Sequence, residues 1–189
     1  MIATIVEDYF AVYPRERDEL EPLSRLIAQF PRDADLKSRH NFVGHLTASG
    51  IVLSADGAQV LLLFHKNLRK FIQPGGHFDC GEESPIAAAR REVAEETSLE
   101  DLELLDLPGA ESLPFDINVH AIPANPRKGE PAHFHHDLRF LFRCRRSNAA
   151  VVIDLEESED WRWVSRADFL QMADFAHLGD KLQAALAAR

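Results

Sequence analysis

The chain has 189 residues, of which 46% are hydrophobic, so one buried core is expected. Its formal net charge of −10 is not offset by a basic stripe. This argues against a nucleic-acid polymer as partner but allows a small phosphorylated ligand that binds with cations. The two cysteines are too few for a disulfide framework and suit a reducing compartment. With no signal-peptide pattern and no run of about 18 apolar residues, we expect a cytoplasmic protein without a membrane partner.

The first part of the chain, residues 1–38, is predicted to be a helical extension. Apolar side chains recur at helical spacing between residues 20 and 30, and Asp18 and Glu21 have the spacing of a capping box. The helix is expected to pack on the core or on a second subunit of a homodimer, with a part in shaping a substrate pocket as the alternative. Residues 39–189 are expected to form the main domain, including C-terminal helices.

The main domain alternates strand and helix patterns. The apolar run VLLLFH at residues 60–65 is typical of a strand buried on both faces, and Asp56-Gly57 before it marks a turn. The remaining strand patterns occupy residues 42–54, 71–73, 102–107, 116–122, 135–144 and 161–164, and late helices are expected at 167–172 and 178–189. Strands with helices inserted between and behind them predict the α/β class, with a three-layer α/β/α arrangement around a mixed sheet.

A central helix is predicted to begin after Ser84, because serine is a favourable N-cap and Pro85 fits the first helical position. One stripe of this helix can pack on a sheet, and its members are Ile86, Ala89, Val93 and Thr97.

Another stripe of the same helix gathers three carboxylates, Glu92, Glu95 and Glu96, at positions i, i+3 and i+4. They repel one another unless a divalent cation binds between them, and oxygen ligands suit Mg²⁺ or Mn²⁺. Arg91 lies four residues before Glu95 and can hold that side chain by a charged hydrogen bond.

The stretch from Pro74 to Leu99 resembles the signature of the Nudix hydrolases. That signature reads Gly, five residues, Glu, seven residues, Arg-Glu, an aliphatic residue, any residue, Glu-Glu, any residue, Gly and an aliphatic residue. The matching residues of this sequence are Gly76, Glu82, Arg91, Glu92, Val93, Glu95, Glu96 and Leu99. The resemblance implies a Nudix-like α/β/α sandwich around a mixed β-sheet, preceded here by the N-terminal helical extension.

Two positions depart from this signature. Eight residues, where the signature has seven, separate Glu82 from Arg91, so either Glu82 or Glu83 takes the first-glutamate position. Ser98 stands where the signature has glycine, which affects the turn that ends the helix.

The resemblance implies hydrolysis of a diphosphate linkage. Glu92, Glu95 and Glu96 would hold Mg²⁺, with Mn²⁺ as the alternative, helped by the Gly76 carbonyl and Glu82. Glu95 and Glu96 would thus be catalytic, and Arg91 would orient a glutamate.

Family members often take the general base from a loop late in the chain. Here the acidic run at residues 156–160 offers Glu156, Glu157 and Glu159. We favour Glu157 as base or late metal ligand, the alternative being an ordinary solvated acidic loop.

Three residues outside the carboxylates are candidates for binding substrate. His77 follows Gly76 and is expected to contact a phosphate or another part of the substrate. Arg127 and Lys128 lie on a loop punctuated by Pro and Gly and are expected to meet a distal phosphate, unless the loop is merely solvated. The identity of the substrate stays open among nucleoside triphosphates, dinucleoside polyphosphates and nucleotide sugars. Pro114, 15 residues past Leu99, resembles a feature of ADP-ribose-cleaving members.

Histidines cluster before the 135–144 strand. On a strand His133 and His135 share a face while His136 points the other way, and Asp137 follows. A site of two histidines and a carboxylate would suit a transition metal, whereas a polar pocket of hydrogen-bonded histidines would need none.

The sequence therefore predicts a Nudix-type pyrophosphohydrolase that acts on a small diphosphate-containing molecule. The first alternative is a binding module that senses a nucleotide without cleaving it. The second is an enzyme like isopentenyl diphosphate isomerase, with Cys80 moving protons, although no activating base lies near Cys80 in sequence.

Overall fold

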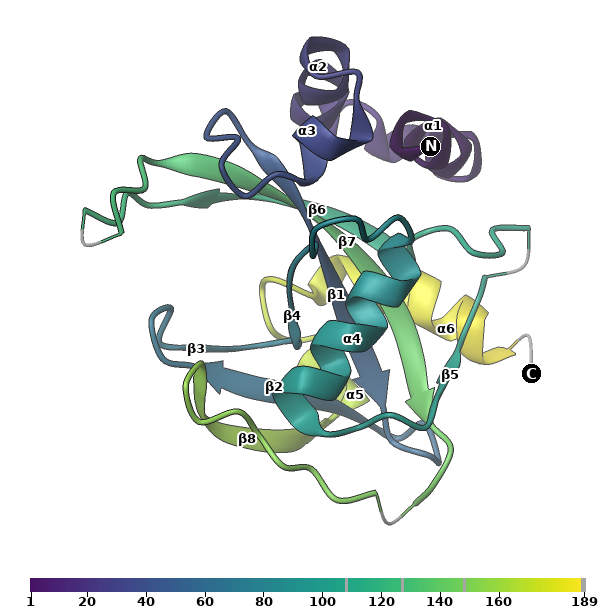
Figure 1. The fold of residues 1–189 in the computed structure, drawn as a ribbon. Coiled ribbons are helices and arrows are strands. Elements are labelled where there is room, and N and C mark those ends of the chain that lie inside the picture. Colours follow the sequence, from purple (N-terminus) through teal and green to yellow (C-terminus); the bar gives the residue numbers. More distant parts are fainter. Residues whose placement is uncertain (108, 127, 148, 188–189) are drawn as a thin grey trace.

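The computed structural model describes residues 1–107, 109–126, 128–147 and 149–187 (Figure 1). Its helices are α1 (Ile2–Val12), η1 (Pro14–Glu16), α2 (Glu21–Gln29), α3 (Asp33–Lys37), α4 (Pro85–Thr97), α5 (Arg166–Phe169), η2 (Ala176–Leu178) and α6 (Gly179–Ala187). Its strands are β1 (His45–Leu53), β2 (Gln59–His65), β3 (Lys70–Ile72), β4 (Gly75–His77), β5 (Leu102–Leu104), β6 (Asp116–Ile122), β7 (His133–Cys144) and β8 (Ser158–Ser165). None of the helices in these ranges is both long and apolar enough to cross a membrane.

The strands form one mixed sheet with the central order β3-β2-β1-β7-β5. In addition β4 pairs with β1, β6 with β7 and β8 with β2. β1 and β7 are parallel along their whole pairing, from His45 opposite His135 to Leu53 opposite Arg143, whereas the other pairs are antiparallel. The mixed sheet agrees with the predicted fold class.

Alternate residues of the central strands face two separate cores. On one face Val52 of β1 and Phe142 of β7 pack with Val93 of α4. On the other, Ile51 of β1 packs with Leu182 of α6. The sheet thus lies between α4 on one side and α5 with α6 on the other, as Figure 1 shows, and the predicted three-layer α/β/α arrangement is confirmed.

Helix α4 approaches β1 closely because Gly50 has no side chain. A Cβ atom at Gly50 would lie 2.4 Å from Cγ2 of Val93 and 3.0 Å from a ring carbon of Phe142. The absence of a side chain therefore sets how near the helix that carries the glutamates lies to the sheet.

Buried apolar side chains of the N-terminal helices join the same core as α4, while Val12 and Tyr13 at the end of α1 pack against the core on the α6 side. The predicted capping box of Asp18 and Glu21 is wrong. Helix α2 starts after Leu20 with no side-chain cap, and Pro22 in the first turn fixes its start instead. The division into residues 1–38 and 39–189 stays a prediction.

A buried polar network joins this extension to the end of the chain. Lys181 of α6 donates to the Tyr9 hydroxyl at 2.7 Å and pairs with Glu16 at 2.8 Å and Asp116 at 3.1 Å. Asp116 is also within 3.2 Å of Arg139 Nη1. Lys181, Asp116 and Arg139 are all buried, so the charges compensate one another away from water.

Several predicted boundaries shift. The strand expected at 102–107 ends at Leu104. The Leu105 amide still donates to the Leu141 carbonyl, and the chain then turns through a bridge between Leu107 and Ala110. The helix expected at 167–172 spans Arg166–Phe169 only, with Ser165 capping it through the Asp168 amide. Strand β4 was not expected from the sequence, since two glycines have low strand propensity.

Candidate active site

The central helix α4 forms as the sequence predicts. The Ser84 hydroxyl accepts from the Ala87 amide at 3.3 Å, and Pro85 occupies the first helical position. The helix ends at Thr97 because Ser98 adopts a left-handed conformation with φ of 58°, the conformation that glycine at this position of the Nudix signature would adopt without strain. Thus Ser98 preserves the terminating turn.

Strand β4 brings its glycine backbone against the glutamates of α4. The Gly75 amide donates to Oε1 of Glu96 at 3.2 Å. A Cβ atom at Gly76 would lie 2.7 Å from both carboxylate oxygens of Glu92. Any side chain at Gly76 would displace the Glu92 carboxylate, so glycine is required for this close approach.

Burial raises the pKa values of two of these glutamates. Burial raises the pKa of Glu96 to about 8, and the charges of Glu157 and Glu92 add to the rise against the opposing hydrogen bond from Gly75. Burial likewise raises the pKa of Glu92 to about 7, although Arg91 bonds to it. The third glutamate, Glu95, has a side chain that is 58% exposed. Negative charge at Glu92 and Glu96 is therefore costly unless a positive charge lies beside them.

Arg91 links the loop before the helix to the helix itself. Its guanidinium donates to Glu82 at 3.0 Å, to Glu92 at 3.0 Å and to Glu95 at 2.8 Å. It also donates to the His77 carbonyl at 2.8 Å. Of the two glutamates that the sequence left open, Glu82 bonds Arg91 from the loop, while Glu83 is exposed.

The charge of Glu157, in the late acidic loop, acts on two of the same carboxylates. Its negative charge contributes to the raised pKa of both Glu92 and Glu96, and its carbonyl accepts from the Lys66 amide at 3.0 Å. Glu159 instead forms an ion pair with Arg69, away from these groups. Glu157, which the sequence favours as the base, is thus the member of the acidic run whose charge acts on both Glu92 and Glu96.

Comparisons with known proteins fit this geometry. The NUDIX domain model matches residues 44–185, which is most of the chain. The chain belongs to the Nudix family. As a member of this family it is a Nudix-type hydrolase of phosphoric anhydrides, the class of enzyme that the sequence predicts. No curated protein matches the chain.

Solved structures show the same fold. A Caenorhabditis elegans Ap4A hydrolase complex is similar with 22% identity and a TM-score of 0.52, covering 76% of this chain and 95% of that one. A Nudix-family hydrolase from Clostridium perfringens has 21% identity and a TM-score of 0.53, with 77% and 98% covered. The Escherichia coli dihydroneopterin triphosphate pyrophosphohydrolase has 17% identity and a TM-score of 0.53, with 75% and 95% covered.

The Nudix glutamates are held apart in this structure. Among the described residues, no three carboxylates of the Nudix signature place oxygens within 4.8 Å of one another. The reason is that Arg91 attracts Glu82, Glu92 and Glu95, whereas Glu96 turns to the Gly75 amide. A cation that binds all three helix glutamates must therefore compete with Arg91 for two of them.

The candidate substrate-binding residues fall in different places. His77 extends from the sheet face opposite α4, with its ring centroid 5.1 Å from those of His45 and His135. Lys128 is exposed, and its charge is one of the smaller contributions that lower the pKa of His77 after burial. Arg127 lies outside the described residues.

The predicted site of two histidines and Asp137 is not formed. Asp137 accepts from Thr47 at 3.1 Å and from Ser49 at 2.7 Å, hydrogen bonds that satisfy its oxygens within the sheet. His133 and His135 meet His45 instead. Sequence reasoning missed His45 because it lies on β1, far from His133 and His135 in the sequence. Only the parallel pairing of β1 with β7 brings it opposite His135. Cys80, on which the isomerase alternative depended, is an exposed free thiol.

We predict that Glu96→Gln stabilises the metal-free protein at alkaline pH. The folded-state pKa of about 8 lies above the ordinary glutamate pKa of 4.5, so the folded protein holds a proton that the unfolded chain has lost. The free energy of unfolding therefore falls as pH rises from about 4.5 to 8, and glutamine, which cannot ionise, removes this contribution. At pH 8.5 in EDTA we expect a gain on the order of 3 kcal/mol, roughly 6–12 °C in Tm.

The exposed Glu100 provides the control, because Glu100→Gln removes the same charge just beyond the helix. Thermal unfolding followed by circular dichroism at pH 5 and pH 8.5 tests the prediction. Equal Tm changes for Glu96→Gln at the two pH values would contradict the raised pKa.

Proposed function

We propose that this Nudix hydrolase cleaves a diphosphate linkage in a nucleoside diphosphate-linked or related small molecule, and that the reaction requires Mg²⁺, with Mn²⁺ as a substitute. The observation that carries the proposal is that the buried Glu96 and the half-buried Glu92 are both held against the Gly75-Gly76 backbone, with raised pKa values. Removing carboxylates from water in this way destabilises the fold, and a bound cation offsets that cost.

The residues present fit a hard divalent cation. Glu92, Glu95 and Glu96 offer carboxylate oxygens on one face of α4, and Gly76 and Glu82 lie beside them. All of these are oxygen donors, the type that Mg²⁺ prefers. When bound, such an ion would supply positive charge to the phosphate oxygens and lower the pKa of water at the site.

The side chains of this protein would then perform the remaining tasks. Water attacks one phosphorus atom, the new P–O bond forms as the bridging P–O bond breaks, and the water proton passes to a base. We assign the base to Glu157, because its charge acts on Glu92 and Glu96 and its side chain is exposed to incoming water. Arg91 holds Glu82, Glu92 and Glu95 in position rather than contacting substrate.

Residues that do not hold the cation would recognise the substrate. Lys128 and Arg127 are proposed to meet a distal phosphate and His77 a nearer one. The cytoplasmic location and the homodimer stay predictions.

A panel of diphosphate compounds tests the proposal. Two of the similar structures are an Ap4A hydrolase and a dihydroneopterin triphosphate pyrophosphohydrolase, so the panel includes dinucleoside tetraphosphates and dihydroneopterin triphosphate beside nucleoside triphosphates and nucleotide sugars. We expect chromatography to show phosphate-ester products from at least one compound with Mg²⁺, and none in EDTA. Binding without turnover in Mg²⁺ would contradict hydrolysis and favour a sensor.

We predict that Lys128→Ala weakens substrate binding. Losing a cation that meets a phosphate at an exposed site should raise KM about 3- to 10-fold while kcat changes little, and the effect should shrink at high salt. Steady-state kinetics at two salt concentrations measures this. Arg146→Ala is a charge-matched control, since Arg146 is exposed beyond the other end of β7 and pairs with Asp101. An unchanged KM in Lys128→Ala would remove this loop from binding.

A further inference from the structure

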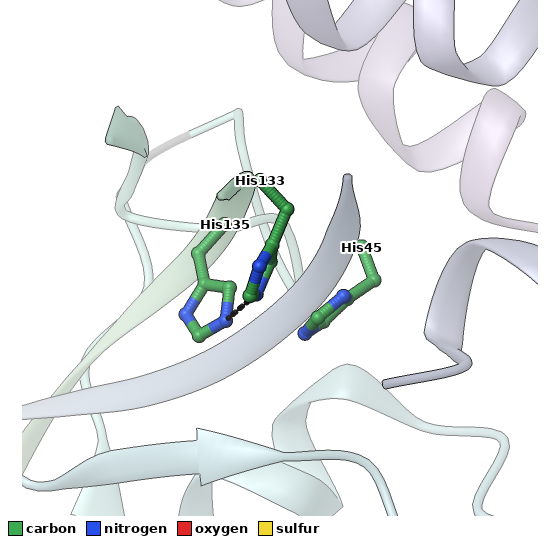
Figure 2. A group of neighbouring side chains, drawn as sticks. All are labelled: His45, His133 and His135. Carbon is green, nitrogen blue, oxygen red and sulfur yellow. Dashed lines mark hydrogen bonds between the residues drawn. The ribbon is translucent and has the colours of Figure 1, made fainter. Parts of the chain in front are cut away.

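Three histidines converge on the sheet face opposite α4. His45 begins β1 and pairs with His135 of β7, and His133 lies two residues earlier on the same face of β7. Figure 2 shows the three rings from these two strands turned toward one another. One ring nitrogen from each lies within 4.8 Å of the other two. His45 and His133 are buried, and His135 is half-buried.

The hydrogen bonds of two rings fix which nitrogen is free. Nδ1 of His133 lies 2.8 Å from the Pro131 carbonyl, and Nδ1 of His45 lies 3.1 Å from the Asn41 carbonyl. A carbonyl only accepts, so each Nδ1 carries the proton and each Nε2 keeps a lone pair. Histidines that ligate metals are commonly oriented in this way, by a carbonyl on the nitrogen that does not bind.

The free nitrogens of His45 and His133 lie close to His135, whose Nε2 forms a hydrogen bond with Nε2 of His133. Nε2 of His45 is buried and has no hydrogen-bond partner among the described residues. Nε2 of His133 lies 3.3 Å from Nε2 of His135. Two nitrogens bound to one tetrahedral Zn²⁺ at about 2.0–2.1 Å are separated by roughly 3.3–3.4 Å. The His133–His135 pair thus already has the spacing of two zinc ligands.

We propose that His45, His133 and His135 bind a borderline transition-metal ion, Zn²⁺ in the first instance, at a site separate from the glutamates of α4. Imidazole nitrogens favour Zn²⁺ over the hard Mg²⁺, so the two sites select different ions. Three protein ligands leave one tetrahedral position for water or another group, and His77 lies beside the cluster. A bound ion would join the parallel strands β1 and β7 where both begin.

The electrostatics of the cluster agree with neutral, ligating imidazoles. Burial lowers the pKa of His135 to about 2, and the neighbouring histidines, His45 and His77 among them, add to this. Burial also lowers the pKa of His45. At neutral pH the rings of His45 and His135 are therefore uncharged, the state that binds metal.

Zinc titration of the full chain without a histidine tag tests the proposal. The protein is first stripped with EDTA and then titrated in millimolar Mg²⁺, against a chromophoric zinc chelator as competitor. We expect one equivalent of Zn²⁺ to bind, and His45→Gln and His133→Gln each to weaken binding at least about 100-fold. His40→Gln is the matched control, because His40 is exposed and outside the cluster. It should bind Zn²⁺ like the unaltered protein.

Two further readouts keep the test decisive. Zn²⁺ should raise the Tm of the unaltered protein and of His40→Gln, but not of His133→Gln. Co²⁺ in place of Zn²⁺ should give the intense visible absorption of a tetrahedral ion, lost in His133→Gln. The circular dichroism spectra of the variants show whether they fold.

The outcomes separate this site from the hydrolytic one. Glu96→Gln should keep its zinc while it loses hydrolysis, so either proposal can fail alone. The zinc proposal is overturned if the unaltered protein binds no Zn²⁺ in millimolar Mg²⁺. It is equally overturned if His45→Gln and His133→Gln bind as tightly as His40→Gln, or if Glu96→Gln abolishes binding.

Discussion

Replacing Glu96 by glutamine is expected to slow hydrolysis by roughly 10²- to 10³-fold. Glu96 is only 9% exposed, and its carboxylate faces the Gly75 amide in the angle between β4 and α4. Glutamine keeps the size and can still accept from Gly75, but it removes the negative charge that would hold a cation. The loss should therefore appear in kcat, with the fold intact. Initial rates at saturating Mg²⁺, with the best substrate of the panel, measure it.

Glu100→Gln is again the control, since it removes an exposed charge just past the end of α4. It should hydrolyse at the rate of the unaltered protein. The proposed role of Glu96 is wrong if the two variants turn over equally fast. If circular dichroism showed that the Glu96→Gln protein is unfolded, its rate would carry no information. That result would still contradict the account, which predicts a higher Tm for this variant in EDTA at pH 8.5.

The second large effect is expected on stability, from Asp116→Asn. Burial alone would raise the pKa of Asp116, but the hydrogen bond from His177 and the charges of Lys181 and Arg139 outweigh it and hold the value at about 2. Asparagine leaves two buried cations with one fewer carboxylate. We expect a loss of about 2–4 kcal/mol in the free energy of unfolding, roughly 5–15 °C in Tm.

The pH dependence of this loss follows from the sign of the shift. Because the folded-state pKa lies below the ordinary aspartate pKa of 3.8, the charged Asp116 contributes its full stabilisation above about pH 4. The contribution shrinks as the pH falls toward 2. Asp180→Asn is the control, because Asp180 directly precedes Lys181 in the sequence and its side chain is exposed. Thermal unfolding at pH 7 that shows equal Tm values for both variants would rule out a stabilising network.

The parts of the molecule that local chemistry determines were predictable. Helix α4 begins where Ser84 and Pro85 indicate, and its apolar stripe packs on the sheet through Val93. The continuous apolar run of β2 is buried, as expected of an inner strand. In each case the signal lies within a few residues of the feature it predicts.

The parts that depend on distant segments were not predictable from one sequence. His45 joins His133 and His135 only because β1 and β7 pair in parallel, and nothing near His45 in sequence indicates that register. Similarly, Asp116, Lys181 and Tyr9 lie on three separate elements and meet only when the N-terminal extension packs against α6. That Glu82 rather than Glu83 bonds Arg91 likewise depends on the path of the loop.

The account rests on a cation held by the glutamates of α4, and anomalous diffraction from a crystal grown with Mn²⁺ tests it most directly. A manganese peak is expected beside Gly76, with carboxylate oxygens of Glu92 and Glu96 among its ligands. The result that would contradict the account is a map with no peak there, in a crystal of protein that turns over substrate, and with Glu92 and Glu96 still bonded to Arg91 and Gly75.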